Sequence, residues 1–194
     1  MLILGSRAIG TPVMSLQTGT RLAETSRAII DPGKLTIFAF ELEGPLLTDR
    51  PSFLRTQDIR ETGAIGMIID SADEFVGLND IIKLQELYEL GFPLVGMKVV
   101  DEHKRKLGKV EDYSLETNSF VIQQLTIRRG LLRGITDTGL LVHRSQIVEI
   151  NDAHIVVKGN DTRTTAPAEK IRAVAAEYAN PFRQPSPRPE QREN

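Results

Sequence analysis

Histidine and carboxylate side chains are the groups of this chain that could carry acid–base or metal chemistry, because the sequence contains no cysteine. His103 falls in a predicted turn, His143 near a strand end and His154 at a strand start. None of them stands in an H-E-x-x-H pattern or a comparable metal-binding spacing. We therefore predict no metal site, and the lack of cysteine excludes thiolate ligands, disulfides and a cysteine nucleophile.

Asp101 and Asp112 are the carboxylates best placed to act as a general acid or base. Each stands where an aspartate is expected in a turn or at a strand edge for structural reasons. A separate acidic loop at 70–74 is expected to face solvent. The sequence holds no phosphate-binding loop, G-x-G-x-x-G or G-x-S-x-G motif. We predict no catalytic residue and no cofactor, and hence a protein that is not an enzyme.

Basic residues gather in two predicted loops and are the candidate partner-binding residues. They are Lys104, Arg105, Lys106, Lys109, Arg128, Arg129 and Arg133. If the fold brings both loops to one rim, the patch could hold phosphate or an acidic protein face. The plainer interpretation, which we favour, is that these bases keep the turns soluble and blunt strand edges. Only Tyr113 and Phe120 are aromatic nearby, and Phe120 is expected in the core, which weighs against a single-stranded RNA platform.

The segments that must position these loops form an internal repeat. Residues 10–73 resemble residues 96–161, with 35–37 over 120–122 and 67–69 over 155–157, at an offset of about 85–88 residues. This period is longer than that of a solenoid, so each copy is predicted to be a small domain. The alternative is a chance similarity between two β-rich stretches.

Short strands are predicted throughout both copies, because apolar and polar residues alternate, as in 107–115, and β-branched residues are frequent, as in 120–127. The predicted strands of copy one are 11–15, 21–30, 35–42, 52–56 and 64–69. Those of copy two are 99–100, 107–115, 120–127, 140–142 and 154–158, with a 3₁₀ turn at 144–148. Five or six short strands with little helix favour a closed or nearly closed small barrel.

Two helices are predicted, one between the copies and one after them. Asn79 can cap the start of the first and Gly91 its end, and the second has Pro167 in its first turn. The Pro-rich, polar end of the chain is expected to be disordered. The predicted organisation is copy one at 1–78, a linker helix at 79–91, copy two at 92–161, a C-terminal helix at 162–180 and a disordered tail at 181–194.

Copy two resembles a PRC-barrel domain. The residues that carry the resemblance are Val100, Asp101, Leu107, Gly108, Val110 and Asp112, with a polar turn at 103–106. Copy one is a degenerate version, in which Ser15, Ala23 and Arg27 replace the Asp, the Gly and the second Asp. The resemblance covers residues 3–75 and 92–160 and implies two barrels of about six strands each in tandem. It makes the expected fold class mainly β.

The resemblance also implies protein contact rather than catalysis. PRC-barrels dock the H subunit of photosynthetic reaction centres on its membrane core, form the C-terminal domain of a ribosome-maturation factor, and occur in archaeal cell-division adaptors. We therefore predict a non-enzymatic adaptor or scaffold that binds another protein. The alternative is an RNA-processing or ribosome-maturation factor that uses the basic rim of copy two. Salt separates the two, because phosphate binding weakens steeply as salt rises.

Composition sets the remaining expectations. The 194 residues include 24 Lys+Arg and 26 Asp+Glu, so the chain as a whole has no nucleic-acid footprint. No apolar run approaches the roughly 20 residues of a membrane helix, and the apolar N-terminus is too short for a signal peptide. We expect a soluble, cytoplasmic protein without a transmembrane segment. Gly108 is predicted to mark a bend or a close backbone approach. Valine there should destabilise copy two, and alanine should cost less, because its counterpart Ala23 indicates that the site admits one methyl group.

Overall fold

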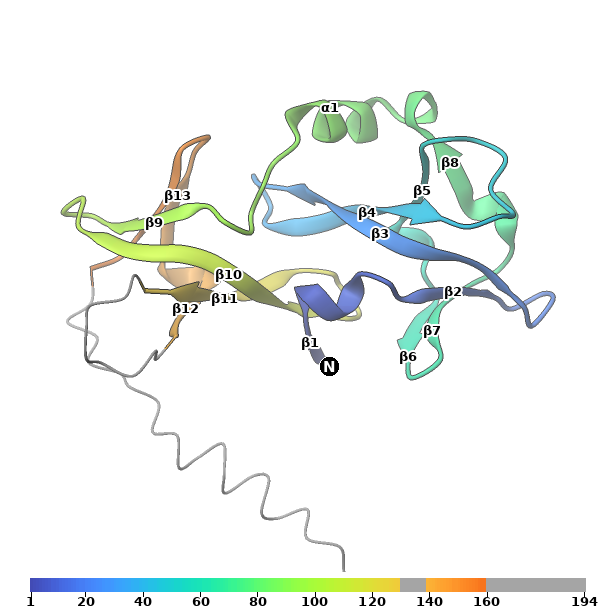
Figure 1. Cartoon of the computed structure of the whole chain (residues 1–194), viewed down its shortest axis with the longest axis horizontal. Helices are drawn as coiled ribbons and strands as arrows, with labels where there is room; N and C mark the ends of the chain where they lie inside the picture. Colours follow the sequence, from blue (N-terminus) through green and yellow to red (C-terminus); the bar gives the residue numbers. More distant parts are fainter. Residues whose placement is uncertain (130–138, 160–194) are drawn as a thin grey trace, which may run out of the picture. The chain divides into compact units, whose positions relative to one another are not determined.

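The computed structural model describes residues 1–129 and 139–159, which form a mainly β structure with two mixed sheets and one α-helix (Figure 1). The predicted strands are all found, with ends that shift by a few residues. The predicted helix at 162–180, the tail at 181–194 and Arg133 lie outside the described residues.

The first sheet is built by copy one, and its strands are hydrogen-bonded in the order β6-β7-β2-β3-β4-β5-β8. The strands are β2 (Pro12–Ser15), β3 (Arg21–Asp31), β4 (Thr36–Glu43), β5 (Ser52–Arg55), β6 (Glu61–Gly63), β7 (Gly66–Ile69) and β8 (Phe75–Gly77). β2 and β7 run parallel, and the other neighbours run antiparallel.

The second sheet is built by copy two, in the order β12-β11-β10-β9-β14-β13. Its strands are β9 (Lys98–Asp101), β10 (Lys106–Glu116), β11 (Ile122–Arg128), β12 (Leu140–His143), β13 (Ile147–Ile150) and β14 (His154–Val157). A further strand, β1 (Leu2–Leu4), comes from the start of the chain and pairs antiparallel with β10. The first residues of the predicted copy one therefore take part in the second sheet.

The two sheets share one topology. If β2 to β7 are matched in turn with β9 to β14, the strand orders coincide, and each sheet has a single parallel pair, β2 with β7 and β9 with β14. Register shifts fall at equivalent places, after Thr25 in β3 and after Val110 in β10. The residues with positive φ that precede β4 and β11, Leu35 and Phe120, are equivalent as well. The repeat in the sequence is thus a repeat in strand order, register and local irregularity.

Hydrogen bonding leaves both sheets open in the described residues, because β12 and β13 end one strand order and β6 and β8 end the other. Closure of each copy into a barrel therefore stays a prediction.

The copies meet where the chain turns from β3 into β4 and from β10 into β11. Thr36 and Val121 form a β-bridge, in which the Ile37 N–H donates to the carbonyl of Phe120 and the Ile122 N–H donates to that of Leu35, both at 3.0 Å. The two bonds join equivalent residues reciprocally, as the surfaces of a two-fold dimer do. Apolar burial reinforces this joint. One core cluster contains residues of both copies, among them Leu35, Ile37, Phe40, Phe120, Ile122 and Leu125.

The linker helix α1 spans Ile82–Leu90. Its predicted end is confirmed, because Gly91 adopts φ 56° and donates to the carbonyls of Leu87 and Tyr88. Its predicted start at Asn79 is wrong. Asp80 accepts a hydrogen bond from the Gly77 N–H at 2.7 Å and closes a separate 3₁₀ turn ahead of the helix. Leu84 and Leu87 bury the helix against the first sheet, in a cluster with Ile29, Ala39 and Phe53.

Gly108 lies at a register shift between β10 and β9, with φ 153°. A Cβ there would stand 2.8 Å from Cγ2 of Ile127 and closer still to the carbonyl oxygen of Arg128. The expectation that alanine fits this position is therefore wrong. In copy one the glycine lies directly after the neighbouring strand β4 instead of at the position equivalent to Gly108. Ala23 carries the methyl group, and Gly44 is the glycine beside it, where a Cβ would lie 3.2 Å from Cα of Ala23.

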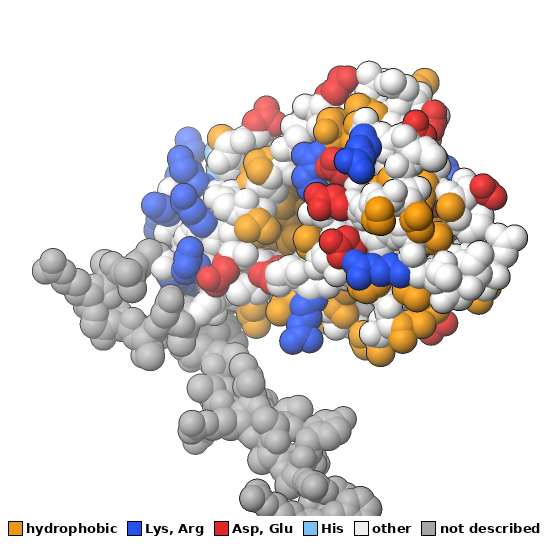
Figure 2. All heavy atoms as spheres, turned by 45° about the vertical axis from the view of Figure 1, so that its right-hand side comes forward, with side chains coloured by type: hydrophobic (Ala, Val, Ile, Leu, Met, Phe, Trp, Pro, Cys, Tyr) orange, Lys and Arg blue, Asp and Glu red, His pale blue; other side chains and the backbone are white. Residues whose placement is uncertain are grey.

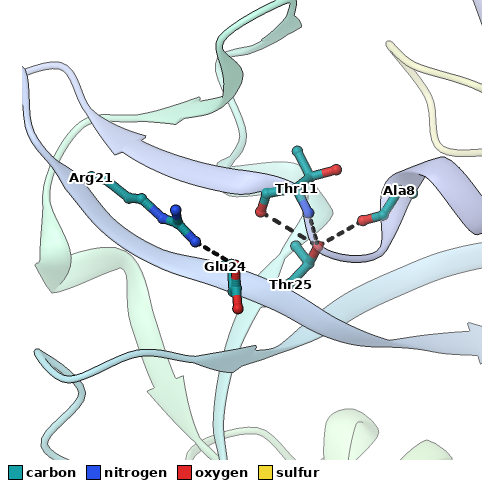
Figure 3. A network of polar contacts seen from close by, with 5 residues as sticks. All are labelled: Ala8, Thr11, Arg21, Glu24 and Thr25. Atoms are coloured by element: carbon teal, nitrogen blue, oxygen red, sulfur yellow. Dashed lines mark hydrogen bonds and ion pairs between the residues drawn. The ribbon is translucent and has the colours of Figure 1, made fainter.

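The passage of the chain from the second sheet to the first is fixed by a buried hydroxyl. Between β1 and β2 runs the 3₁₀ helix η1 (Gly5–Ala8). The Thr25 hydroxyl on β3 donates to the Ala8 carbonyl at 2.7 Å and accepts from the Thr11 N–H at 3.0 Å (Figure 3). Because Thr25 is 1% exposed, water cannot replace these bonds. Nearby, the exposed Arg21 and Glu24 form an ion pair.

Replacing Thr25 by valine keeps the shape of the side chain and removes the hydroxyl. We expect the free energy of unfolding to fall by about 1–3 kcal/mol, because the Ala8 carbonyl and the Thr11 N–H would lose their partner in a dry site. Chemical denaturation measures the loss. Thr25→Ser, which keeps the hydroxyl, is the control and should lose less stability. A valine variant as stable as the wild type would show that this network contributes nothing.

Candidate functional site: a basic rim on the second sheet

The predicted basic residues are positioned by β9, β10 and β11. Lys104 and Arg105 lie in the β9–β10 turn, Lys106 and Lys109 lie on β10, and Arg128 ends β11 with Arg129 directly after it. All six side chains are exposed. At the end of the molecule that carries the β9–β10 hairpin, Figure 2 shows Lys and Arg side chains gathered closely. Arg133 is the only predicted member outside the described residues.

Three bases form a row across neighbouring strands. Lys109 on β10 stands opposite Lys98 on β9 and opposite Arg128 on β11. Directly opposed residues share a face, with Cβ atoms about 4.5–5.5 Å apart, and like charges in such pairs repel. We call Lys98, Lys109 and Arg128 the basic row. Lys98 is absent from the sequence-based candidates, because only the pairing of β9 with β10 brings it beside Lys109.

The row has little negative charge to balance it. Glu111, two residues beyond Lys109, lies 3.6 Å from Arg128. Within residues 1–129 and 139–159, no ion pair is found for Lys98 or Lys109. Lys98 and Lys109 therefore leave positive charge on this surface that no ion pair in those ranges balances, and salt in solution screens it.

Arg105 differs from the other bases because its charge is already used. Its guanidinium lies 2.6 Å from the carboxylate of Asp101, which is 2% exposed. Asp101 also accepts from the backbone N–H groups of Arg105 and His103. Burial alone would raise the pKa of Asp101, but the hydrogen bonds and charge of Arg105, with the His103 N–H, hold that pKa below its ordinary value of 3.8. Asp101 thus organises the turn, and its counterpart Ser15 accepts from the Thr18 N–H in copy one.

A pH prediction follows from this carboxylate. A group whose pKa is lower in the folded protein stabilises it above the unfolded value and loses that contribution as pH falls through the folded value. We expect stability to be steady above about pH 5 and to fall as the pH drops through about 4. Asp70, whose pKa is lowered by its hydrogen bond from Arg60, adds to the same fall. In thermal melts at each pH, Asp101→Asn should be less stable at pH 7 and lose less on acidification. An unaltered pH dependence would rule out this role for Asp101.

Asp112 and His143, which could have carried acid–base or metal chemistry, have structural hydrogen-bond partners. The Asp112 carboxylate accepts from the Ser6 N–H at 3.1 Å and from the Ser6 hydroxyl at 2.6 Å, and so holds η1 against β10. Nδ1 of His143 accepts from the Ser145 N–H in the predicted 3₁₀ turn, found at Arg144–Gln146. In the part of the chain that the structure describes, no group of three His, Asp or Glu side chains could hold a metal ion.

A pocket of about 470 Å³ lies beside the joint between the copies. Its walls come from β3, from the end of α1 with the segment after it, from η1 with Ile9, and from β10 at Glu111–Tyr113. They include the apolar residues Ala28, Leu87 and Phe92. Burial, with the charge of Asp112, raises the pKa of Tyr113 to about 12, so its hydroxyl stays protonated at neutral pH. No local sequence pattern reveals this pocket, because its walls come from segments that lie far apart in the chain.

No protein-family model matches the chain, and the search of curated proteins finds no match either. The resemblance to PRC-barrel domains therefore stays a prediction based on the residues that carry it. In the described residues no helix is long and apolar enough to cross a membrane.

Proposed function

We propose that this protein is a non-enzymatic adaptor that docks an acidic face of a partner protein on its basic rim. The basic rim consists of the basic row together with Lys104, Lys106 and Arg129. The observation that supports the proposal best is the basic row, in which Lys109 is opposed by a like charge on both neighbouring strands. Such opposition weakens a sheet, and an anionic partner would relieve it. The proposal agrees with the adaptor role that the PRC-barrel resemblance implies. We also propose, on the basis of the same resemblance, that each copy closes into a barrel.

A protein partner is favoured over single-stranded RNA by the burial of the aromatic side chains. Tyr113 is 4% exposed and Phe120 is 3% exposed. Proteins that bind single strands without sequence preference stack bases on exposed aromatic rings, and neither residue offers a ring for that purpose. The surface of the rim is therefore suited to charge complementarity with carboxylates.

The test reverses the charge of the basic row in the triple variant Lys98→Glu, Lys109→Glu and Arg128→Glu. A matched control reverses three exposed bases elsewhere, Arg7, Lys34 and Arg50, so both variants have the same net charge. Both are used as bait in extracts of the native cell, and the captured proteins are identified and quantified. We expect the row variant to lose at least about tenfold of the specific capture, because reversed charges repel an acidic face, while the control retains it.

Two results would contradict the proposal. If the row variant captures the same proteins as the wild type, the rim is not the docking face. If instead a single-stranded RNA oligonucleotide binds the wild type tightly, with an affinity that falls steeply as salt rises, the maturation-factor alternative replaces the adaptor.

A further inference from the structure

The central strands are β3 in copy one and β10 in copy two. One edge of each pairs with the next strand along the chain, and the other edge can be divided into a first and a second half. In copy two, β9 covers the first half of β10, and the residues just before β9 extend the pairing. The Gly96 N–H donates to the Val110 carbonyl, and the Val110 N–H donates to the Met97 carbonyl. β1 covers the second half, where Leu2, Ile3 and Leu4 oppose Glu116, Leu115 and Ser114. The central strand of copy two is thus paired along both halves.

The same edge of β3 in copy one is covered only in its first half. The last bonds to the chain before β2 join the Gly10 N–H to the Thr25 carbonyl and the Thr25 N–H to the Thr11 carbonyl, and they match those of copy two one for one. Beyond Thr25, no strand of the described residues pairs with β3 on this side, because β2 and β4 are its only partners. The residues equivalent to those beneath β1 are Ile29, Ile30 and Asp31.

Space is available beside this uncovered half. The pocket of about 470 Å³ is lined by the β3 residues from Ser26 to Ile30 along one wall. The other walls carry the apolar side chains of Ile9, Leu87 and Phe92, and β10 adds the charged residues Glu111 and Asp112. Its volume lies within the roughly 300–1,000 Å³ of typical ligand pockets. The site therefore combines a strand edge that no other strand pairs with in the described residues and walls that are largely apolar, which are the two components of strand addition.

We propose that the uncovered half of β3 binds an extended aliphatic segment of a partner protein, which adds to the first sheet as a strand antiparallel to β3. The internal repeat specifies the occupant, because the Leu-Ile-Leu sequence of β1 covers the equivalent edge of β10. Backbone hydrogen bonds supply the affinity, and the apolar walls select aliphatic side chains. The inference rests on the proposed adaptor function for the class of partner, but it uses residues other than the basic row.

The experiment uses a synthetic peptide with the sequence of residues 1–7, with blocked ends, added to the full chain. Binding is followed by NMR of the backbone amides. We expect shifts centred on Arg27–Asp31 that saturate with added peptide. A matched peptide, methylated on the backbone nitrogen of Ile3, has the same side chains but lacks the central donor. It should bind at least about tenfold more weakly, since strand addition depends on backbone hydrogen bonds.

Protein variants test the walls of the pocket. Ile9→Glu places a charge in the pocket and should weaken peptide binding by about tenfold or more, whereas Ile65→Glu, the same substitution at an exposed position outside the pocket, should not. The row variant, with Lys98, Lys109 and Arg128 changed to Glu, should bind the peptide as the wild type does. If the wild type does not bind the peptide but captures its partner through the basic row, this inference alone is rejected. If the wild type binds the peptide but partner capture does not depend on the basic row, the adaptor proposal alone is rejected.

Three further outcomes would overturn the inference. Equal binding of the methylated peptide would exclude strand addition. Shifts centred on Ser114–Glu116 would mean that the peptide only displaces β1 from β10. A dimer in sedimentation experiments, with protection before peptide is added of those amides in Arg27–Asp31 that face away from β4, would mean that a second copy of this chain occupies the edge.

Discussion

Gly108→Ala is expected to lower the free energy of unfolding by about 3–5 kcal/mol, among the largest effects of any single methyl group in this chain. Two causes add. The backbone at Gly108 has φ 153°, which side chains rarely tolerate. The added Cβ would also lie 2.8 Å from Cγ2 of Ile127 and overlap the carbonyl oxygen of Arg128, so β10 and β11 must separate. Equilibrium denaturation with urea measures the loss.

Gly96→Ala is the control that separates these two causes. Gly96 also has a positive φ, 89°, but a Cβ there meets no atom within 4 Å. Its substitution should cost only the backbone strain, about 1–2 kcal/mol. If the two alanine variants lose the same stability, the contact with β11 has no energetic weight and the strain alone explains both.

Many of the strands, the repeat and the end of the helix could be predicted, because they depend on signals in the local sequence. The alternation in 107–115 and the β-branched run in 120–127 identify β10 and β11, since each reports directly which face is buried. The similarity of the two halves predicts the shared strand order. Gly91 identifies the end of α1 because the left-handed conformation there suits glycine.

Features that depend on distant pairing could not be predicted in this way. β1 is only three residues long, and its partner lies more than a hundred residues later in the chain. Lys98 joins the candidate site only through the register of β9 on β10. The expectation for Gly108 fails because Ala23 has Gly44 beside it, whereas Gly108 lies against the carbonyl of Arg128. In each case the decisive partner lies on another strand, and no local pattern specifies it.

The basic loops illustrate both situations within one site. The residue types and the two loops are visible in the sequence. Of the six predicted bases that the structure describes, all are exposed, and Lys104, Lys106, Lys109 and Arg129 have no ion pair within the described residues, while Arg128 lies 3.6 Å from Glu111. Arg105 is the exception, since its bond to buried Asp101 could be recognised only from the geometry of the turn. Charge in a loop therefore indicates a candidate surface, and the pairing of strands decides which of the charges remain available.

Phe40→Ala is expected to remove about 3–5 kcal/mol of stability, the usual cost of emptying a buried phenylalanine site. Phe40 is fully buried, and its ring lies edge-on to that of Phe120 with centroids 5.9 Å apart. This pair belongs to the core cluster that contains residues of both copies. Because the copies share this cluster, the wild type should unfold in one cooperative transition, and the alanine variant should lose part of that coupling.

Phe53→Ala provides the matched control. Phe53 is equally buried, but it packs in the cluster between α1 and the first sheet, with Leu84 and Leu87. It should lose similar stability while keeping a single transition, since the joint between the copies is untouched. Calorimetry distinguishes the two variants, because the calorimetric and van't Hoff enthalpies should agree for Phe53→Ala and diverge for Phe40→Ala. Agreement in both variants would mean that the backbone bonds at Ile37 and Ile122, with the pairing of β1, are enough to make the two copies unfold together.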